Sequence, residues 1–236
     1  SRGLGDVYKR QTVSRLVDRR IGKGLAGIFT LSKTKEADYH SFQEVVDEMQ
    51  ATGVEDSVVI NVMPGVWAEQ ILIDAIPGAG HRNKIIFRGM PGSEKVLVSP
   101  ANIVVRQDTV SAPLVMMHAS GIRFENISFN GKDWEAAAAL TACSDICFDN
   151  CVFSGAEKGI LFADTTVRCT VRHCRFAGLA DTGNSYIGIE NVGFEEENMI
   201  EANMFSVGNN ETSVGIKWRA VSALTKLINN EICTYG

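Results

Sequence analysis

Three short segments of this sequence share a glycine and an isoleucine, and two of them carry a charged residue directly after this pair. Side chains alternate between the two faces of a strand, so the residues that follow the isoleucines point outward when the isoleucines point inward. Charged hydrogen-bonding groups and aromatic rings are suited to binding sugars. The row therefore predicts a groove for a polysaccharide, and the alternative is a solvated sheet face with scattered charges. The segments are GILFAD (159–164), GIENVG (188–193) and GIKWRA (215–220), the outward row is Leu161, Glu190 and Lys217, and the candidate substrate-binding residues are Asp164, Glu190, Lys217, Arg219 and Trp134.

A degenerate sequence repeat, called the repeated phrase below, occurs five times and predicts the elements that position these residues. Each phrase alternates apolar and polar residues, which is typical of a strand. The phrases recur every 23 to 29 residues, and a near-constant period in this range marks a solenoid. Their closing apolar residues are Phe129, Phe153, Phe176, Phe205 and Ile232.

A polar residue interrupts the middle of three phrases, where an extended chain must bend. Asn126, Asn150 and His173 occupy this position. Asparagine tolerates left-handed backbone and forms local hydrogen bonds, so it suits a corner. We expect an all-β, right-handed parallel β-helix (a β-solenoid) with one coil per repeat and coils about 4.8 Å apart.

An amphipathic helix is predicted before the solenoid. Ser41 and Glu44 have the spacing of a capping box, and Gly53 stands at the expected helix end. We expect this helix to cover the open N-terminal end of the solenoid rather than to bind a separate partner. Its apolar stripe is Phe42, Val45, Val46 and Met49.

The composition is that of an ordinary soluble domain with one core. The chain has 236 residues, of which 45% are hydrophobic and 22% charged, and its net charge is −5. This acidic balance, without a basic stripe, argues against a nucleic-acid partner. The sequence has no apolar run of the roughly 20 residues that a membrane span needs.

Both ends of the chain differ from the repeat. Residues 1–24 are expected to be a non-native or disordered leader, because residues 1–11 resemble translated adapter sequence. Residues 25–236 then form a single β-helix domain. The last strand-like phrase, 226–233, is followed by no capping segment, so we expect C-terminal coils to be missing.

Several stretches resemble the pectin-lyase-like β-helix proteins, and among these they are most similar to the pectin methylesterases. The likeness lies in the helix, the Pro-Gly-x-Trp-x-Glu turn that follows it, and three segments of the central coils. These stretches are DYHSFQEVVDEM (38–49), VVINVMPGVWAEQILI (58–73), KIIFRGMPG (84–92), EAAAAL (135–140), FSGAEKGIL (153–161) and CRFAGLAD (174–181).

The resemblance implies a set of catalytic positions. Pectin methylesterases use an aspartate nucleophile, a second aspartate as acid and two glutamines that stabilise the oxyanion. Asp181 falls at the nucleophile position, Lys158 at the acid position, and Glu135 and Glu157 where the glutamines stand. A carboxylate cannot donate a hydrogen bond to an oxyanion unless it is protonated, so this chain departs from the family pattern.

These considerations leave three hypotheses open. The first is a carbohydrate-active protein acting on a polysaccharide such as pectin, as an esterase or as a polysaccharide lyase or hydrolase. The second is a non-catalytic β-helix used as a scaffold, for adhesion or for glycan binding. The third is an enzyme whose active site lies in the missing coils. The resemblance implies a secreted or cell-surface location and no cofactor, and the oligomeric state is left open.

Six cysteines are predicted to be buried and stacked rather than to bind a metal. Cys143, Cys147 and Cys151 are four residues apart along extended chain, so each step spans roughly 13 Å. Cys151 and Cys174 occupy the same repeat position, where a disulfide is the alternative to stacked free thiols. The full set is Cys143, Cys147, Cys151, Cys169, Cys174 and Cys233.

Overall fold

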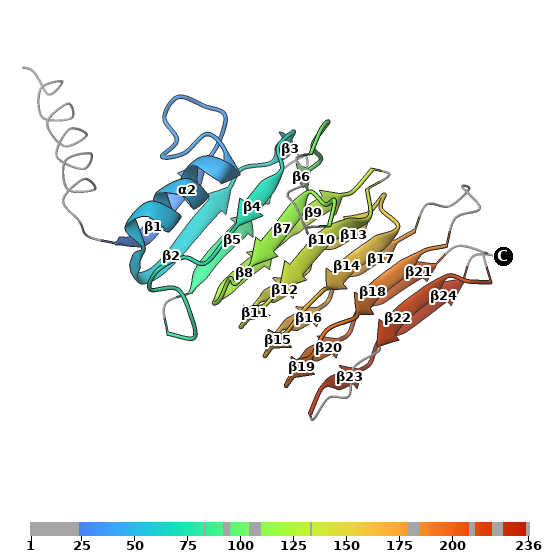
Figure 1. Cartoon of the computed structure of the whole chain (residues 1–236). Coiled ribbons are helices and arrows are strands. Elements are labelled where there is room, and N and C mark those ends of the chain that lie inside the picture. The colour runs from blue at the N-terminus through green and yellow to red at the C-terminus, as the bar shows by residue number, and fades with distance from the viewer. Residues whose placement is uncertain are drawn as a thin grey trace, which may run out of the picture.

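The computed structural model describes residues 24–82, 84–91, 95–103, 110–132, 134–178, 185–207, 211–218 and 224–234. Its strands form parallel sheets that run side by side along one axis (Figure 1). Successive coils add one strand to each of three long sheets, which makes a parallel β-helix of about seven turns. The predicted all-β solenoid with one N-terminal helix is therefore confirmed.

Four sheets make up the solenoid. The eight-stranded sheet consists, in spatial order, of β1 (Leu25–Leu31), β2 (Val54–Val62), β5 (Ile85–Gly89), β8 (Ile122–Glu125), β12 (Cys147–Asp149), β16 (Thr170–Arg172), β20 (Met199–Glu201) and β23 (Lys226–Ile228). The six-stranded sheet consists of β4 (Ile71–Ile73), β7 (Leu114–Met117), β10 (Ala136–Thr141), β14 (Lys158–Phe162), β18 (Ile187–Asn191) and β22 (Val214–Trp218). The seven-stranded sheet consists of β3 (Gly65–Trp67), β6 (Val96–Val98), β9 (Ile127–Asn130), β13 (Val152–Ser154), β17 (Arg175–Ala177), β21 (Met204–Val207) and β24 (Glu231–Thr234). A three-stranded sheet consists of β11 (Cys143–Ser144), β15 (Thr166–Val167) and β19 (Glu195–Glu196).

The closing residues of the repeated phrase stack on one another inside the solenoid. Phe153 pairs in register with Phe129 on one side and with Phe176 on the other. Phe205 continues the row, and Ile232 ends it. The ring centroids of the four phenylalanines are 5.5, 5.1 and 4.6 Å apart in stacked geometry. Each predicted repeat thus corresponds to one coil. The phenylalanines at equivalent positions of successive coils stack to form part of the apolar core.

The polar residues in the middle of the phrases are corners, as predicted. Asn126, Asn150 and His173 have φ angles of 58°, 52° and 52°, in the left-handed region. The side-chain amide of Asn150 donates a hydrogen bond to the Asn126 side-chain oxygen at 2.7 Å, so adjacent corners also bond to each other. These left-handed residues turn the chain from β8 to β9, from β12 to β13 and from β16 to β17, which links the eight-stranded sheet to the seven-stranded sheet.

The helix α2 (Phe42–Thr52) covers the N-terminal end of the core (Figure 1). The Ser41 hydroxyl accepts a hydrogen bond from the Glu44 backbone N–H at 3.0 Å, and Gly53 ends the helix with φ of 75°. The four predicted apolar residues are buried, and the Phe42 ring packs against the rings of Trp67 and Phe87. Within the described residues, no helix is long and apolar enough to cross a membrane.

A carboxylate from the next coil holds the start of this helix. Glu69 accepts backbone hydrogen bonds from Phe42 at 3.0 Å and from Gln43 at 3.1 Å. Burial raises the pKa of Glu69, although these two N–H groups act in the opposite direction. The turn that resembles the pectin methylesterase motif therefore has a structural role here, because its glutamate caps α2.

Candidate functional site

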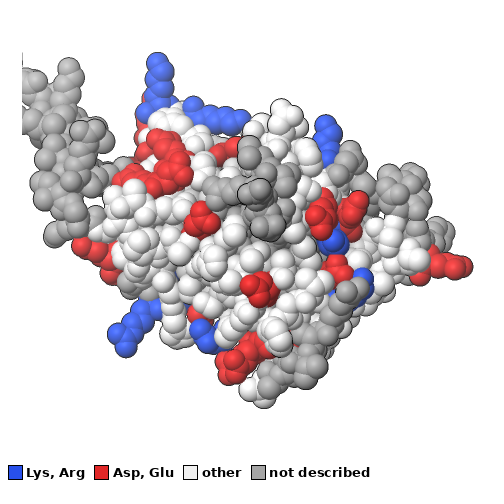
Figure 2. All heavy atoms as spheres, viewed as in Figure 1, with Lys and Arg blue, Asp and Glu red and all other residues white. Residues whose placement is uncertain are grey.

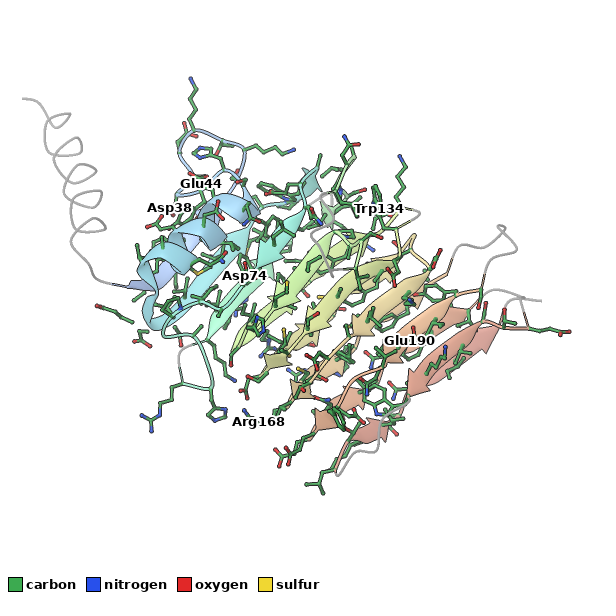
Figure 3. All side chains as sticks on the ribbon, in the orientation of Figure 1. Asp38, Glu44, Asp74, Trp134, Arg168 and Glu190 are labelled. Carbon is green, nitrogen blue, oxygen red and sulfur yellow. The ribbon has the colours of Figure 1, made fainter. Side chains whose placement is uncertain are left out.

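A ladder of alternating charges crosses the outer face of the six-stranded sheet. The Lys158 ammonium lies 3.0 Å from a carboxylate oxygen of Glu135 and 3.6 Å from Glu190. The Lys217 ammonium lies 2.9 Å from the other carboxylate oxygen of Glu190. We call these four residues the charge ladder. Figure 2 shows red and blue side chains gathered over β14, β18 and β22, and Figure 3 labels Glu190 at the centre of this group.

Strand register produces part of this ladder. Glu190 pairs with Leu161 on one side and with Lys217 on the other, so the outward row predicted from the sequence is confirmed. Lys158 belongs to a neighbouring row and reaches Glu190 diagonally, because its own register partner is Ile187. The long lysine side chain therefore connects two rows that the sequence pattern treats as separate.

The carboxylate of Glu190 is the most enclosed charge of the ladder. Its side chain is 7% exposed, compared with 36% for Lys217 and 42% for Glu135. Burial acts to raise the pKa of Glu190, but the hydrogen bond from Lys217 and the charges of both lysines lower it further, so the net pKa lies below its usual value. Glu190 is therefore an ionised hydrogen-bond acceptor at neutral pH and not a proton donor.

The same row is apolar in the earlier coils. Val115, Ala139 and Leu161 precede Glu190 in register, and all three are buried. They belong to a second apolar cluster that is separate from the interior core. The outer face of the sheet thus changes from covered and apolar in β7, β10 and β14 to charged in β18 and β22. The accessible polar part of the face lies at the end of this row.

An aromatic residue, Trp134, directly precedes one residue of the charge ladder in the sequence. Trp134 immediately precedes Glu135 and is half-buried, and Figure 3 labels it near the start of β10. Its indole nitrogen is buried and has no hydrogen-bond partner among the described residues, and the same holds for the Tyr186 hydroxyl just before β18. Burial strongly raises the pKa of Tyr186. Buried donors without partners are rare, which marks the strand starts of this sheet as polar positions not satisfied by the fold itself.

Two other predicted site residues, Glu157 and Asp164, do not join the charge ladder. Glu157 is exposed, and the described part of the chain holds no ion pair to its side chain. Asp164 follows the far end of β14, roughly 20 Å along extended chain from Lys158, and its carboxylate accepts hydrogen bonds from the N–H and hydroxyl of Thr165. Asp181 and Arg219 lie outside the described residues, so their predicted roles stay predictions.

Sequence reasoning missed a second charged cluster, on the outer face of the eight-stranded sheet. Asp149 pairs in register with Glu125 and with Arg172, and it forms an ion pair with Arg172 at 2.7 Å. The register argument that aligned the segments starting at 159, 188 and 215 would also have aligned these residues. The signal is therefore present in the repeated phrases, because their polar residues follow the same register as their apolar residues.

The cysteines are free thiols, largely as expected. Cys143, Cys151, Cys169 and Cys174 are buried, whereas Cys147 and Cys233 are partly exposed. Burial raises the pKa of Cys143 to about 11 and that of Cys169 to about 12, which keeps both protonated. Within the part of the chain that the structure describes, no three His, Cys, Asp or Glu side chains are grouped closely enough to hold a metal ion.

No protein-family model matches this sequence, and no curated protein matches it. Among solved structures, a pectin methylesterase mutant in complex with a hexasaccharide is similar over 84% of this chain and 67% of that chain, with 13% identity and a TM-score of 0.50. A pectin methylesterase from Aspergillus niger is similar over 90% and 77%, with 16% identity and a TM-score of 0.49. A putative glycosyl hydrolase from Parabacteroides merdae is similar over 88% and 98%, with 10% identity and a TM-score of 0.49. The chain therefore has the parallel β-helix fold that is also found in pectin methylesterases.

Proposed function

We propose that this protein binds an acidic polysaccharide of the pectin type across the outer face of its six-stranded sheet. The observation that supports this is the charge ladder, in which lysines and glutamates from four successive coils lie on one face. Its direction along the solenoid axis suits an extended chain molecule, because equivalent positions recur at each coil, about 4.8 Å apart. The proposed location, secreted or at the cell surface, follows from this choice of ligand.

The two lysines supply the recognition of a carboxylate. An ammonium group has three donors, and among the described residues Lys217 has an ion pair with Glu190 only. The remaining donors of Lys217 point from a 36% exposed side chain and are available to a uronate. Glu190 and Glu135 accept hydrogen bonds from sugar hydroxyls. A neutral glycan would use only these hydroxyl contacts, so the proposal favours an acidic one.

Affinity electrophoresis tests the binding proposal directly. We expect polygalacturonate in the gel to retard the protein, highly methyl-esterified pectin to retard it less, and a neutral galactan to have little effect. Retardation should weaken as salt is added, because exposed charges are screened within about 10 Å at 0.1 M. Equal mobility in all three gels at low salt would contradict the proposal.

A pectinesterase-like activity is the second candidate function. It is supported by the contact between Lys158 and Glu135, two residues that the resemblance places at catalytic positions. In this proposal Asp181 attacks the ester carbonyl, while Lys158 provides positive charge and a proton near the leaving methanol. The same proposal makes Glu157 and Glu135 the neighbours of Asp181 from adjacent coils. Release of methanol from esterified pectin is the measurement that separates this function from binding alone.

A further inference from the structure

A cavity of about 320 Å³ opens on the outer side of the eight-stranded sheet, away from the charge ladder. Its floor contains the outward side chains of Cys147 and Thr170, which pair in register on β12 and β16. Figure 3 labels Arg168 at its rim. We call this cavity the arginine pocket, and its lining includes Lys84, Arg123, Cys147, Arg168, Thr170 and Arg172.

One wall of the arginine pocket is fixed by a bidentate ion pair. Asp145 accepts hydrogen bonds from Arg168 Nε at 2.9 Å and Nη2 at 2.8 Å, and His81 Nδ1 lies 3.6 Å from the same carboxylate. The hydrogen bonds from Arg168 lower the pKa of Asp145. Asp145 and Arg168 are corner residues of adjacent coils, and each has a left-handed φ of 53°. The backbone therefore also helps to position the two side chains. The guanidinium plane is therefore held in one orientation.

The opposite wall is built in the same way. Asp149 accepts from Arg172 Nε at 3.0 Å, from Arg172 Nη2 at 2.7 Å and from Arg123 Nη2 at 2.6 Å. Arg123 Nε lies 2.7 Å from Glu125. Asp145 and Asp149 contact the Nε and Nη2 side of Arg168 and Arg172, whereas Arg123 donates to Asp149 through Nη2 alone and its buried Nε has no hydrogen-bond partner among the described residues. The Nη1 groups of all three arginines have no hydrogen-bond partner among the described residues, and neither has the Lys84 ammonium.

The charge of the arginine pocket is opposite to that of the chain. Four positively charged side chains line it, and three carboxylates pair with the arginines, namely Asp145 in the lining and Asp149 and Glu125 beside it, in a chain whose net charge is −5. Exposed ion pairs contribute little to stability, so stability alone does not account for this concentration of arginine. When a carboxylate holds one side of an arginine guanidinium in place, the remaining N–H groups are well placed to bind a planar or tetrahedral oxyanion.

We propose that the arginine pocket is a binding site for an oxyanion, either the carboxylate or sulfate group of an acidic saccharide or a free inorganic anion. The free Nη1 groups of Arg123, Arg168 and Arg172 and the Lys84 ammonium supply the donors. The Thr170 hydroxyl on the floor supplies a further donor. The cavity lies at the lower end of the roughly 300–1,000 Å³ range of small-molecule sites, which fits a small anion or a single sugar unit rather than an extended chain. This site is on a different sheet from the charge ladder and does not depend on the function proposed for that ladder.

Cys147 provides a reporter inside the arginine pocket. Cys147 and Cys233 are the two partly exposed thiols, and Cys233 lies on β24, outside the pocket lining. The test measures alkylation of both thiols by mass spectrometry with sodium sulfate, sodium phosphate or digalacturonate, each against sodium chloride at equal ionic strength. We expect the anion to slow alkylation of Cys147 about threefold or more and to leave Cys233 unchanged. Protection by digalacturonate alone assigns a saccharide, and protection by the inorganic ions as well assigns a general oxyanion site.

Two variants make the test specific. Lys84→Met removes an ammonium that has no described partner, so it should fold normally and weaken the protection of Cys147. Arg172→Met should weaken it further, with the melting temperature recorded as a check on folding. Lys35→Met, an exposed lysine on the loop before α2, serves as the charge-matched control and should keep full protection. Equal protection of Cys147 and Cys233, no protection by any anion, or full protection in both pocket variants would overturn the proposal.

Discussion

Lys217 donates to Glu190 at 2.9 Å across two adjacent coils, and Lys158 approaches the same carboxylate at 3.6 Å from the preceding coil. One enclosed carboxylate thus holds two cations in a row along the solenoid axis. Removing the Glu190 carboxylate would take the shared partner from both lysines, whereas removing Lys217 leaves the enclosed carboxylate paired with Lys158. Lys217 is the exposed partner, which makes it the better residue for testing function.

We predict that Lys217→Met weakens binding of polygalacturonate about tenfold, which is the loss expected for one charged hydrogen bond. The melting temperature should change little, because Lys217 is 36% exposed. Affinity electrophoresis over a range of polymer concentrations measures the change. Lys35→Met carries the same change of charge away from the ladder and should bind as the wild type does. A similar loss in both variants would show that only net charge matters.

The pH dependence of stability should reveal the pairing of Glu190. Its folded-state pKa is lowered from the ordinary 4.5, so ionised Glu190 stabilises the folded protein above that pH. This contribution is lost as the pH falls through the folded-state pKa. We expect Glu190→Gln to cost roughly 1–3 kcal/mol at neutral pH and less in acid. Urea unfolding of the wild type and of Glu190→Gln, at neutral pH and below about pH 4.5, measures the difference in their free energies of unfolding. Because both proteins contain Asp145 and Asp149, the titration of these two residues cancels in the difference. A difference that does not shrink in acid would contradict this reading of the ladder.

Glu69 should stabilise the N-terminal helix through its two backbone contacts. Glu69→Ala removes the acceptors for the N–H groups of Phe42 and Gln43, and we expect a loss of about 1–2 kcal/mol in the free energy of unfolding. Glu69→Gln keeps one acceptor oxygen and should lose less. Urea unfolding measures the free energy of unfolding of both variants, and we expect Glu69→Gln to be the more stable of the two. If Glu69→Gln were the more damaging of the two, the carboxylate would not be acting as a cap.

An esterase function makes a separate prediction. If Asp181 is the nucleophile, Asp181→Asn should abolish methanol release from esterified pectin without changing the melting temperature. Binding of polygalacturonate by the ladder should survive in this variant. Methanol release that persists in Asp181→Asn would remove Asp181 from the mechanism. Activity absent from the wild type would leave the binding function alone.

Some features follow from sequence because they depend only on spacing. The phrases closing at Phe129, Phe153 and Phe176 predict the coil, since a residue at the same phase of each repeat must lie at the same depth in the stack. The corners at Asn126 and Asn150 follow from the same phase, together with the tolerance of asparagine for left-handed backbone. Register also predicts the row of Leu161, Glu190 and Lys217.

Contacts between rows and between loops do not follow from spacing. Lys158 reaches Glu190 because a long side chain spans two rows, and side-chain reach is decided by packing rather than by phase. Glu157 and Asp164 are close to Lys158 in sequence, yet neither joins the ladder, because the strand carries Asp164 away and Glu157 stays in solvent.

The arginine pocket shows the same division between sequence and tertiary structure. The sequence by itself determined the coil, the corners and the rows of the sheets, since these repeat with the chain, and the capping helix, since Ser41, Glu44 and Gly53 mark its ends. Only the tertiary structure decided which charges meet, because His81 reaches Asp145 from a loop outside the repeat, and the arginines of β8 and β16 share one carboxylate of β12. Asp149 and Arg172 are register partners, but the contacts of Asp149 with Arg123 and of Asp145 with His81 join residues more than 20 positions apart through side-chain geometry that no periodic pattern encodes.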